Sequence, residues 1–184
     1  MGLGNPGSSY AANRHNVGAW FVDLLARQQQ TNLRLETKFH GKTAHIHLNQ
    51  QDCWLLFPTT YMNESGRSVK AITDFYKIPV PNILVVHDEL DFSPGDIRLK
   101  QNGGHGGHNG LRDIIEQLQS PEFLRLRLGI GHPGHRDQVH DYVLSNPSNH
   151  DSDLIIKAIE EGLTVLPELI TGNIEKALQL LHSE

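Results

Sequence analysis

The apolar run at residues 83–86 places the strongest constraint on the fold, because short β-branched runs are typical of strands buried inside a sheet. The polar residues His87, Asp88 and Glu89 follow this run directly. Ligand sites in open α/β sheets gather beyond the carboxyl ends of their strands. We therefore expect Asp88 to lie where an interior strand ends at a binding site.

Strand and helix patterns alternate along the rest of the chain. Helical periodicity predicts helices at residues 17–25, 69–76, 111–118 and about 151–181. Asn16 suits the N-cap of the first helix. Pro167 breaks or kinks the last predicted helix, and Asn173 can cap the segment that follows. Strands are expected at residues 42–48 and 53–57, joined as a hairpin by a turn at 49–52, and at 97–100 and 123–130, with Arg125 and Arg127 on one face. This alternation favours an α/β fold with a single domain over residues 1–184. We expect a three-layer sandwich, in which a twisted mixed β-sheet is flanked by helices on both sides.

Gly2, Gly4 and Gly7 match the G-x-G-x-x-G pattern of dinucleotide-binding proteins. That pattern requires a strand before the first glycine and a helix that begins at the last one. Here Met1 directly precedes Gly2, and the segment around Gly7 is typical of a turn. The acidic residue at a suitable distance, Asp23, falls inside the first expected helix. The glycines therefore do not indicate a nucleotide site.

The net charge of -5 by itself argues weakly against a nucleic-acid partner, but the distribution of the charge weakens this argument. From residue 137 onwards the chain holds two Lys/Arg and nine Asp/Glu residues, whereas the preceding part holds 14 and 12. The acidity is thus a property of the C-terminal part. A basic face elsewhere can still attract a polyanion.

The composition favours a cytoplasmic protein. A single cysteine, Cys53, excludes an internal disulfide framework and fits a reducing compartment. No apolar run approaches the ~20 residues of a membrane-spanning helix, and residues 1–10 lack the basic and apolar regions of a secretory signal. We expect no membrane contact, and a monomer, because no long exposed apolar stripe is evident.

Polar residues that could carry chemistry fall into four clusters, at residues 5–10, 14–16, 61–63 and 102–110. The segments GLGNPG, NRHN, PTTYMN, HDELD, GGHGGHNGLRD and RLRLGIGHPG occur in this order between Gly2 and Gly134. They resemble the bacterial peptidyl-tRNA hydrolase family. Several long motifs in one order are far more specific than any single motif. The family has apolar residues before GLGNPG that form a central strand, so we expect either a misassigned or trimmed start or an incomplete strand here.

The resemblance implies hydrolysis of the ester bond between the peptide and the 3′-terminal ribose of peptidyl-tRNA, without a cofactor, a metal or a covalent intermediate. It implies that His15 is the catalytic histidine and that Asp88 orients it. The other residues that it assigns are the catalytic and substrate-binding asparagines Asn5, Asn63 and Asn109, the pocket residues Tyr10, Met62 and His108, and the tRNA-phosphate contacts Lys100, Arg127 and Arg136, with Arg98 as a weaker candidate.

The residue types suit this chemistry independently of the resemblance. Histidine takes up protons near neutral pH and can activate water for attack on an ester. A carboxylate bonded to its second ring nitrogen fixes the tautomer and stabilises the imidazolium. Asparagine amides can bind a peptide backbone and a developing oxyanion. No serine or cysteine nucleophile is indicated, since no G-x-S-x-G elbow occurs.

Other interpretations stay open at this point. A metal-dependent hydrolase could use His105 and His108 with Asp88 or Glu89, although glycines between the histidines preorganise a metal poorly and no helical H-E-x-x-H occurs. A non-catalytic RNA-binding paralogue is expected to have lost the base or its partner, and both are present. The glycines in segment 103–107 predict a mobile lid. Asn63 and Asn109 could equally be helix N-caps.

Overall fold

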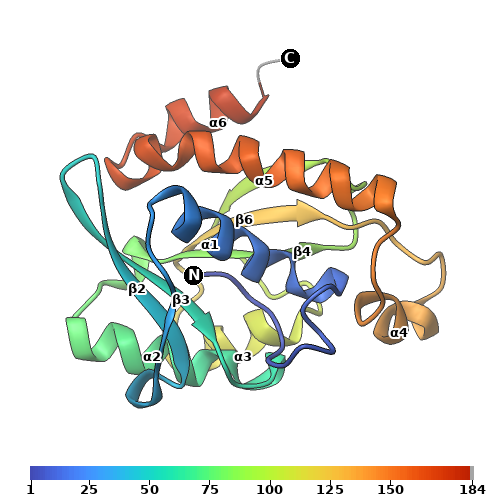
Figure 1. The fold of residues 1–184 in the computed structure, drawn as a ribbon, viewed down its shortest axis with the longest axis horizontal. Helices are drawn as coiled ribbons and strands as arrows, with labels where there is room; N and C mark the ends of the chain where they lie inside the picture. Colours follow the sequence, from blue (N-terminus) through green and yellow to red (C-terminus); the bar gives the residue numbers. More distant parts are fainter. Residues whose placement is uncertain (183–184) are drawn as a thin grey trace.

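The computed structural model, which describes residues 1–182, places strands in a middle layer between two groups of helices (Figure 1). On one side lie α1 (Val17–Gln28), α5 (Asn149–Ile170) and α6 (Ile174–His182), and on the other α2 (Ser65–Tyr76) and α3 (Asn109–Leu118). The short helix α4 (Val139–Val143) lies at one end of the molecule. The expected three-layer α/β arrangement is confirmed. None of the helices in residues 1–182 combines the length and hydropathy that crossing a bilayer requires.

The strands of residues 1–182 form two three-stranded sheets. The first contains β1 (Arg34–Glu36), β2 (Gly41–Leu48) and β3 (Gln51–Pro58) in this order, and all of its pairings are antiparallel. The second has the order β4-β6-β5, in which β4 (Leu84–Glu89) is parallel and β5 (Ile97–Gln101) antiparallel to β6 (Leu124–Gly129). The middle layer therefore consists of two sheets, not of the single continuous sheet that we expected.

Residues 1–3 connect the two sheets. The backbone N–H of Gly2 donates to the carbonyl of Leu56 in β3, and that of Leu3 donates to the carbonyl of Val86 in β4, both at 3.0 Å. Gly2 and Val86 form an isolated parallel bridge. This short segment thus takes the position of the central strand, although its pairing is too short to join the sheets formally.

Close contact between this segment and α1 explains two glycines. A Cβ atom on Gly2 would lie 1.9 Å from the carbonyl oxygen of Gly18, and one on Gly18 would lie 2.3 Å from that of Val86. Both distances are far below van der Waals contact, so only glycine allows this approach. The first glycine of the apparent nucleotide fingerprint therefore serves packing.

Among residues 1–182 the strands separate two apolar cores. Phe21 of α1 and Ile155 of α5 belong to the core on one side, and Phe39 and Ile114 to the core under α2 and α3. Val86 and Val85, adjacent in β4, face opposite cores. The β-branched run is therefore buried on both faces, as its composition predicts.

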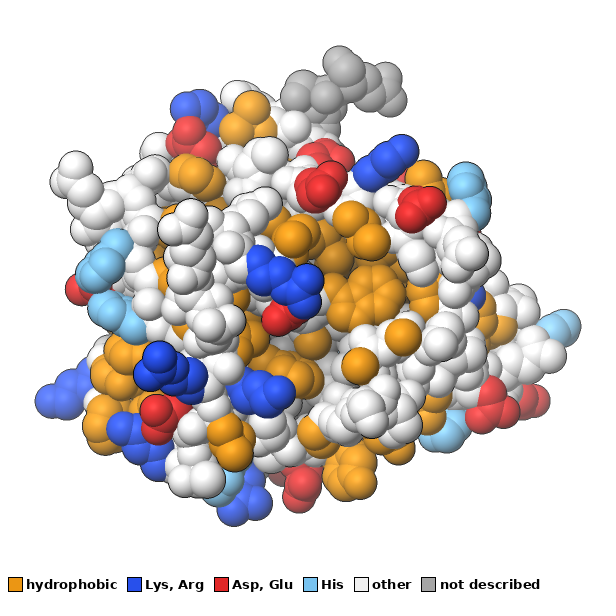
Figure 2. Space-filling view, in the orientation of Figure 1, with side chains coloured by type: hydrophobic (Ala, Val, Ile, Leu, Met, Phe, Trp, Pro, Cys, Tyr) orange, Lys and Arg blue, Asp and Glu red, His pale blue; other side chains and the backbone are white. Residues whose placement is uncertain are grey.

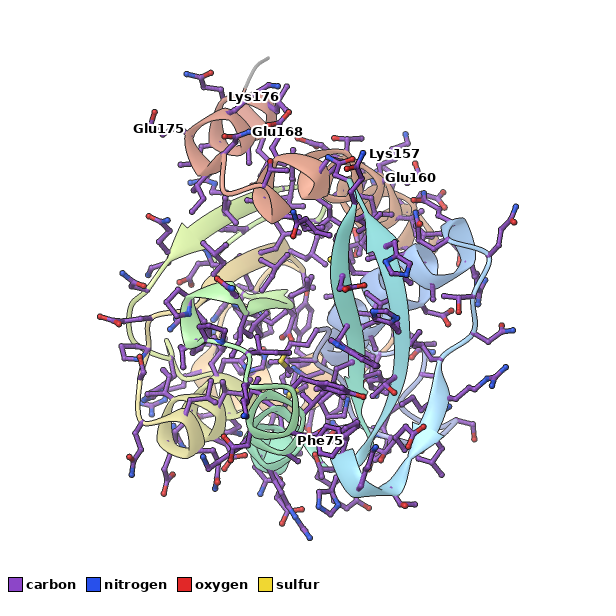
Figure 3. All side chains as sticks on the ribbon, turned by 90° about the vertical axis from the view of Figure 1, so that its left-hand side faces the viewer. Phe75, Lys157, Glu160, Glu168, Glu175 and Lys176 are labelled. Carbon is purple, nitrogen blue, oxygen red and sulfur yellow. The ribbon has the colours of Figure 1, made fainter. Side chains whose placement is uncertain are left out.

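Several local predictions need correction. The hairpin turn is Asn49-Gln50 rather than four residues, with φ of 47° and 64°, which fits a tight type I′ turn. The short edge strand β1 was not predicted. Pro167 does not break α5, which continues to Ile170 before α6 begins. Near this junction Lys176 Nζ donates to the Glu168 carboxylate (Figure 3). The Asn173 amide donates to the same carboxylate at 3.0 Å.

Candidate active site

Asp88, the next-to-last residue of strand β4, accepts hydrogen bonds from two histidines. His15 Nδ1 lies 2.9 Å from Oδ1 and 3.0 Å from Oδ2 of Asp88, and His108 Nε2 lies 3.0 Å from Oδ1. His15 comes from the 3-10 turn Arg14–Asn16 before α1, and His108 precedes α3. Three segments far apart in sequence therefore meet at a carboxylate that is only 4% exposed.

The hydrogen bonds define the tautomers of both rings. The backbone N–H groups of Gly110 and Leu111 point at Nδ1 of His108, at 3.1 and 3.4 Å, so this nitrogen accepts. His108 Nε2 must then carry the proton that Asp88 accepts. The carboxylate likewise requires a proton on His15 Nδ1. Nε2 of His15 consequently keeps its lone pair, as a general base requires.

Burial and charge act in opposite directions at these groups. Burial lowers the pKa of His15, but the charge and hydrogen bond of Asp88 outweigh it, and the pKa of His15 rises above its usual value. Burial raises the pKa of Asp88, but its interactions with His15 and His108 have a larger effect in the opposite direction. The pKa of Asp88 is therefore well below its usual value. Burial lowers the pKa of His87 to about 3. The site thus combines a fixed anion, a histidine of raised proton affinity and a neutral buried ring.

A cavity of about 930 Å³ opens beside this cluster. Its lining includes all the residues to which the sequence assigned a catalytic or binding role, namely Asn5, Tyr10, His15, Met62, Asn63, Asp88, Lys100, His108, Asn109, Arg127 and Arg136. The weaker candidate Arg98 is outside the described lining, and its guanidinium lies 4.4 Å from the ring centre of Phe92.

The three asparagines have different surroundings. Asn5 is buried, and its Oδ1 accepts a hydrogen bond of 2.8 Å from the backbone N–H of Met62. Asn63 and Asn109 are exposed at the cavity and make no side-chain hydrogen bond within residues 1–182. Neither is an N-cap, because Glu64 precedes α2 and His108 precedes α3. Their amides remain available to a ligand.

Comparison with known proteins places this geometry in a family. The family model described as peptidyl-tRNA hydrolase matches residues 1–184. The chain belongs to the peptidyl-tRNA hydrolase family.

Its relatives are similar over nearly their full lengths. Peptidyl-tRNA hydrolase of Coxiella burnetii strain RSA 331 is 58% identical over 182 residues, which cover 99% of this chain and 95% of the relative. That of Legionella pneumophila strain Lens is 49% identical over 183 residues, covering 100% and 97%. A crystal structure of peptidyl-tRNA hydrolase from Acinetobacter baumannii superposes with a TM-score of 0.96 at 46% identity, covering 99% of this chain and 92% of that one.

Asn16 has a role in this peptidyl-tRNA hydrolase fold that the sequence did not reveal. It occupies the N-cap position of α1, as predicted, but its side chain makes no capping hydrogen bond. Instead, Oδ1 accepts from the backbone N–H of Asn5 and Nδ2 donates to the Asn5 carbonyl, both at 2.9 Å. Asn16 thereby ties the turn that carries His15 to the segment that carries Asn5.

Arg125 was also missed as a site residue. Its side chain is 2% exposed, lines the cavity and donates to the carbonyls of Gly103 and Gly104. Burial, together with the nearby charge of Arg127, lowers the pKa of Arg125. A charged residue within an interior strand pattern was the available signal, because arginine is almost never buried without a specific partner. Here the partners are backbone carbonyls of the glycine segment.

The cavity carries more positive charge than the chain as a whole. Its lining holds five Lys/Arg side chains and two acidic ones, Asp88 and Glu89. Arg127 lies 3.8 Å from Glu89, so part of its charge is neutralised locally. The basic region that the charge distribution left possible is thus located at the candidate site of this peptidyl-tRNA hydrolase family member.

The possible metal ligands named from the sequence, His105 and His108 with Asp88 or Glu89, do not come together as one set. His105 accepts a local hydrogen bond of 3.0 Å from the backbone N–H of Gly107 and does not join the cluster. Among the described residues the converging set is His15, Asp88 and His108, whose ligand atoms lie within 4.8 Å of one another. In this set His108 Nε2 and His15 Nδ1 both donate hydrogen bonds to Asp88. These hydrogen bonds alone explain why the three ligand atoms lie close together.

Proposed function

We propose that this chain hydrolyses the ester bond between the peptide and the 3′-terminal ribose of peptidyl-tRNA, using a water molecule that His15 activates. The observation that carries the proposal is the contact between His15 Nδ1 and Asp88 beside the large cavity. Membership of the peptidyl-tRNA hydrolase family supports the substrate class. We propose no covalent intermediate and no cofactor, and a monomer that acts in the cytoplasm as a single domain.

The proposed reaction begins at Nε2 of His15. This nitrogen takes a proton from water as the oxygen attacks the ester carbonyl, and Asp88 stabilises the resulting imidazolium. The tetrahedral intermediate then expels the ribose oxygen, which receives the proton from His15. Such a base contributes about 10²–10⁴-fold to the rate. The free amides of Asn63 and Asn109 are the proposed donors to the substrate or the oxyanion, and one oxyanion donor is worth about 10²–10³-fold.

We propose that two groups of lining residues bind two different parts of the substrate. Tyr10 and Met62 provide apolar contact surface, whereas Lys100, Arg127 and Arg136 provide positive charge. We assign the first pair to the peptide end of the substrate and the three cations to tRNA phosphates. The glycine segment at residues 103–107 contributes Gly104, Gly106 and Gly107 to the lining, which supports its proposed role as a lid.

The decisive experiment is turnover of peptidyl-tRNA by the purified protein and its His15→Ala variant. We expect the variant to lose about 10²–10⁴-fold in kcat, because the base is absent, while its circular dichroism spectrum stays unchanged. His150→Ala is the matched control, since His150 is exposed and outside the described lining of the cavity.

The same assay separates the competing functions. Near-normal turnover by His15→Ala would overturn the assignment of the base, and tRNA binding without any turnover would indicate a non-catalytic module. A metal-dependent hydrolase is the second candidate, because His15, Asp88 and His108 offer three converging ligand atoms. We expect turnover to survive a strong chelator. Loss of turnover that zinc restores would favour the metal.

A further inference from the structure

A second cluster of histidines lies on the β2–β3 hairpin, outside the described cavity lining. His45 Nε2 is 3.0 Å and His47 Nδ1 is 2.9 Å from the same oxygen, Oδ1 of Asp52. The three ligand atoms lie within 4.8 Å of one another. In Figure 2, histidine side chains and an acidic side chain gather at the left edge, over this hairpin. The cluster is open to solvent, since the three side chains are 39%, 71% and 69% exposed.

The hairpin positions these side chains through regular strand geometry. His45 and His47 are two residues apart on β2 and therefore share a face, which is the solvent face because Ala44 and Ile46 are buried. Asp52 on β3 is directly opposite His47 in the register. A two-residue turn fixes this register. The β2–β3 hairpin that carries these residues lies on the side of the molecule that faces the viewer in Figure 3.

We propose that His45, His47 and Asp52 form a binding site for a divalent transition-metal ion of the Cu²⁺, Ni²⁺ or Zn²⁺ class. Nitrogen and oxygen ligands lie about 2.0–2.2 Å from such ions, which places neighbouring ligand atoms about 3–3.5 Å apart. The two separations from Asp52 Oδ1 are close to this range. The ion would replace the ring protons that now point at the carboxylate, and water would complete its coordination.

The ligand types restrict the choice of ion. Imidazole nitrogens suit copper, nickel and zinc, whereas calcium and magnesium prefer sites built from oxygen. Among these ions Cu²⁺ is expected to bind most tightly. The cluster contributes little to the stability of the fold, because all three of its side chains are exposed.

Trp54 provides a local reporter for this site. Its ring centre lies 4.6 Å from that of His45, and the chain contains two tryptophans. In a Trp20→Phe background, Cu²⁺ bound at His45 should quench the fluorescence of Trp54 in a saturable 1:1 titration. We expect Ni²⁺ and Zn²⁺ to compete, and the electron paramagnetic resonance spectrum of bound Cu²⁺ to show two nitrogen ligands.

Variants at the hairpin test the assignment. The double variant His45→Asn/His47→Asn should weaken Cu²⁺ binding at least tenfold, and Asp52→Asn should weaken it less. His140→Asn is the matched control, because His140 forms an exposed pair with Asp141 at 3.1 Å but belongs to no three-residue cluster among the described residues.

Two results would overturn the proposal. One is unchanged Cu²⁺ affinity and Trp54 quenching in the double histidine variant, and the other is the absence of saturable quenching in the Trp20→Phe protein. Because all the substituted side chains at the hairpin are exposed, we expect the variants to keep the fold, and circular dichroism checks this. The fluorescence readout does not depend on hydrolase activity, so the inference can fail or hold independently of the proposed function.

Discussion

The chemistry proposed for the site depends on which nitrogen of each histidine carries a proton. Backbone N–H groups of Gly110 and Leu111 make Nδ1 of His108 an acceptor, and the carboxylate of Asp88 makes Nδ1 of His15 a donor. The start of α3 therefore orients the carboxylate through His108, and the carboxylate orients the base. The start of a helix and the proposed catalytic histidine thus share one oxygen of Asp88, Oδ1.

The first prediction at the residue scale concerns Asp88→Asn and pH. Water activation needs the neutral form of His15, whose pKa is raised by Asp88, so kcat/KM should fall as the pH drops below a midpoint above about 6.5. In Asp88→Asn the negative charge that raises the pKa of His15 is removed, so the midpoint should move to lower pH while kcat falls at least about 10²-fold.

The measurement is kcat and kcat/KM over the range from about pH 5 to 9. Asp91→Asn is a charge-matched control, because Asp91 is exposed and outside the described cavity lining. An acid limb that stays in place in Asp88→Asn would contradict the assigned coupling between the two residues.

The second residue-scale prediction concerns Arg125. Replacement by Met keeps apolar contact but leaves the carbonyls of Gly103 and Gly104 without their donor. We expect faster amide hydrogen exchange in residues 103–107 and a loss of about tenfold in kcat/KM, because mutations that remove a positioning contact can cost this much. Arg125→Lys should recover only part of the loss, since a lysine cannot reproduce the bidentate geometry. Unchanged exchange and kinetics in Arg125→Met would exclude a positioning role.

At the scale of secondary-structure elements, the contact between α2 and α3 holds two parts of the site in place. Asn63 precedes α2, and His108 precedes α3. The helices approach at Gly66, whose N–H donates to the Asp113 carboxylate at 2.6 Å. A Cβ on Gly66 would lie 2.4 Å from the backbone oxygen of Asp113, so the two helices can be this close only with glycine.

Gly66→Ala should therefore separate the two helices. We expect a loss of about 1–3 kcal/mol in the free energy of unfolding, as overpacked positions show, together with reduced turnover. Urea unfolding measures the first effect and the peptidyl-tRNA assay the second. Arg67→Ala, at an exposed position of the same helix, should change stability by less than about 0.5 kcal/mol. Equal stabilities of Gly66→Ala and the native protein would show that the helices can move apart without cost.

At the scale of the whole molecule, the charge distribution matters more than the total. The chain has a net charge of -5, yet five Lys/Arg side chains line the cavity. The excess of acidic over basic residues lies in the part of the chain from residue 137 onwards. This part includes α5 and α6, which belong to the same helical layer as α1. A polyanionic substrate would thus meet a local positive field at the cavity.

Salt dependence tests this distribution. Replacing Lys100 and Arg127 by Ala should raise KM and reduce the slope of log affinity against log salt by about one unit per lost phosphate contact. Arg98→Ala is the matched control, because Arg98 is on β5 with Lys100 but outside the described lining. An unchanged slope in the double variant, or an equal effect of Arg98→Ala, would place the tRNA contacts elsewhere.

The sequence by itself determined the family, the main helices and most strands, and a buried strand that leads to Asp88. These features are readable because local periodicity and contiguous motifs encode them. The tertiary structure alone decided that Asn16 ties down Asn5, that His108 shares Asp88 with His15, and that Arg125 anchors the glycine segment. It also decided that residues 1–3 lie between the two sheets. These contacts join residues 11 to 85 positions apart, so they exist only once packing has brought their elements together.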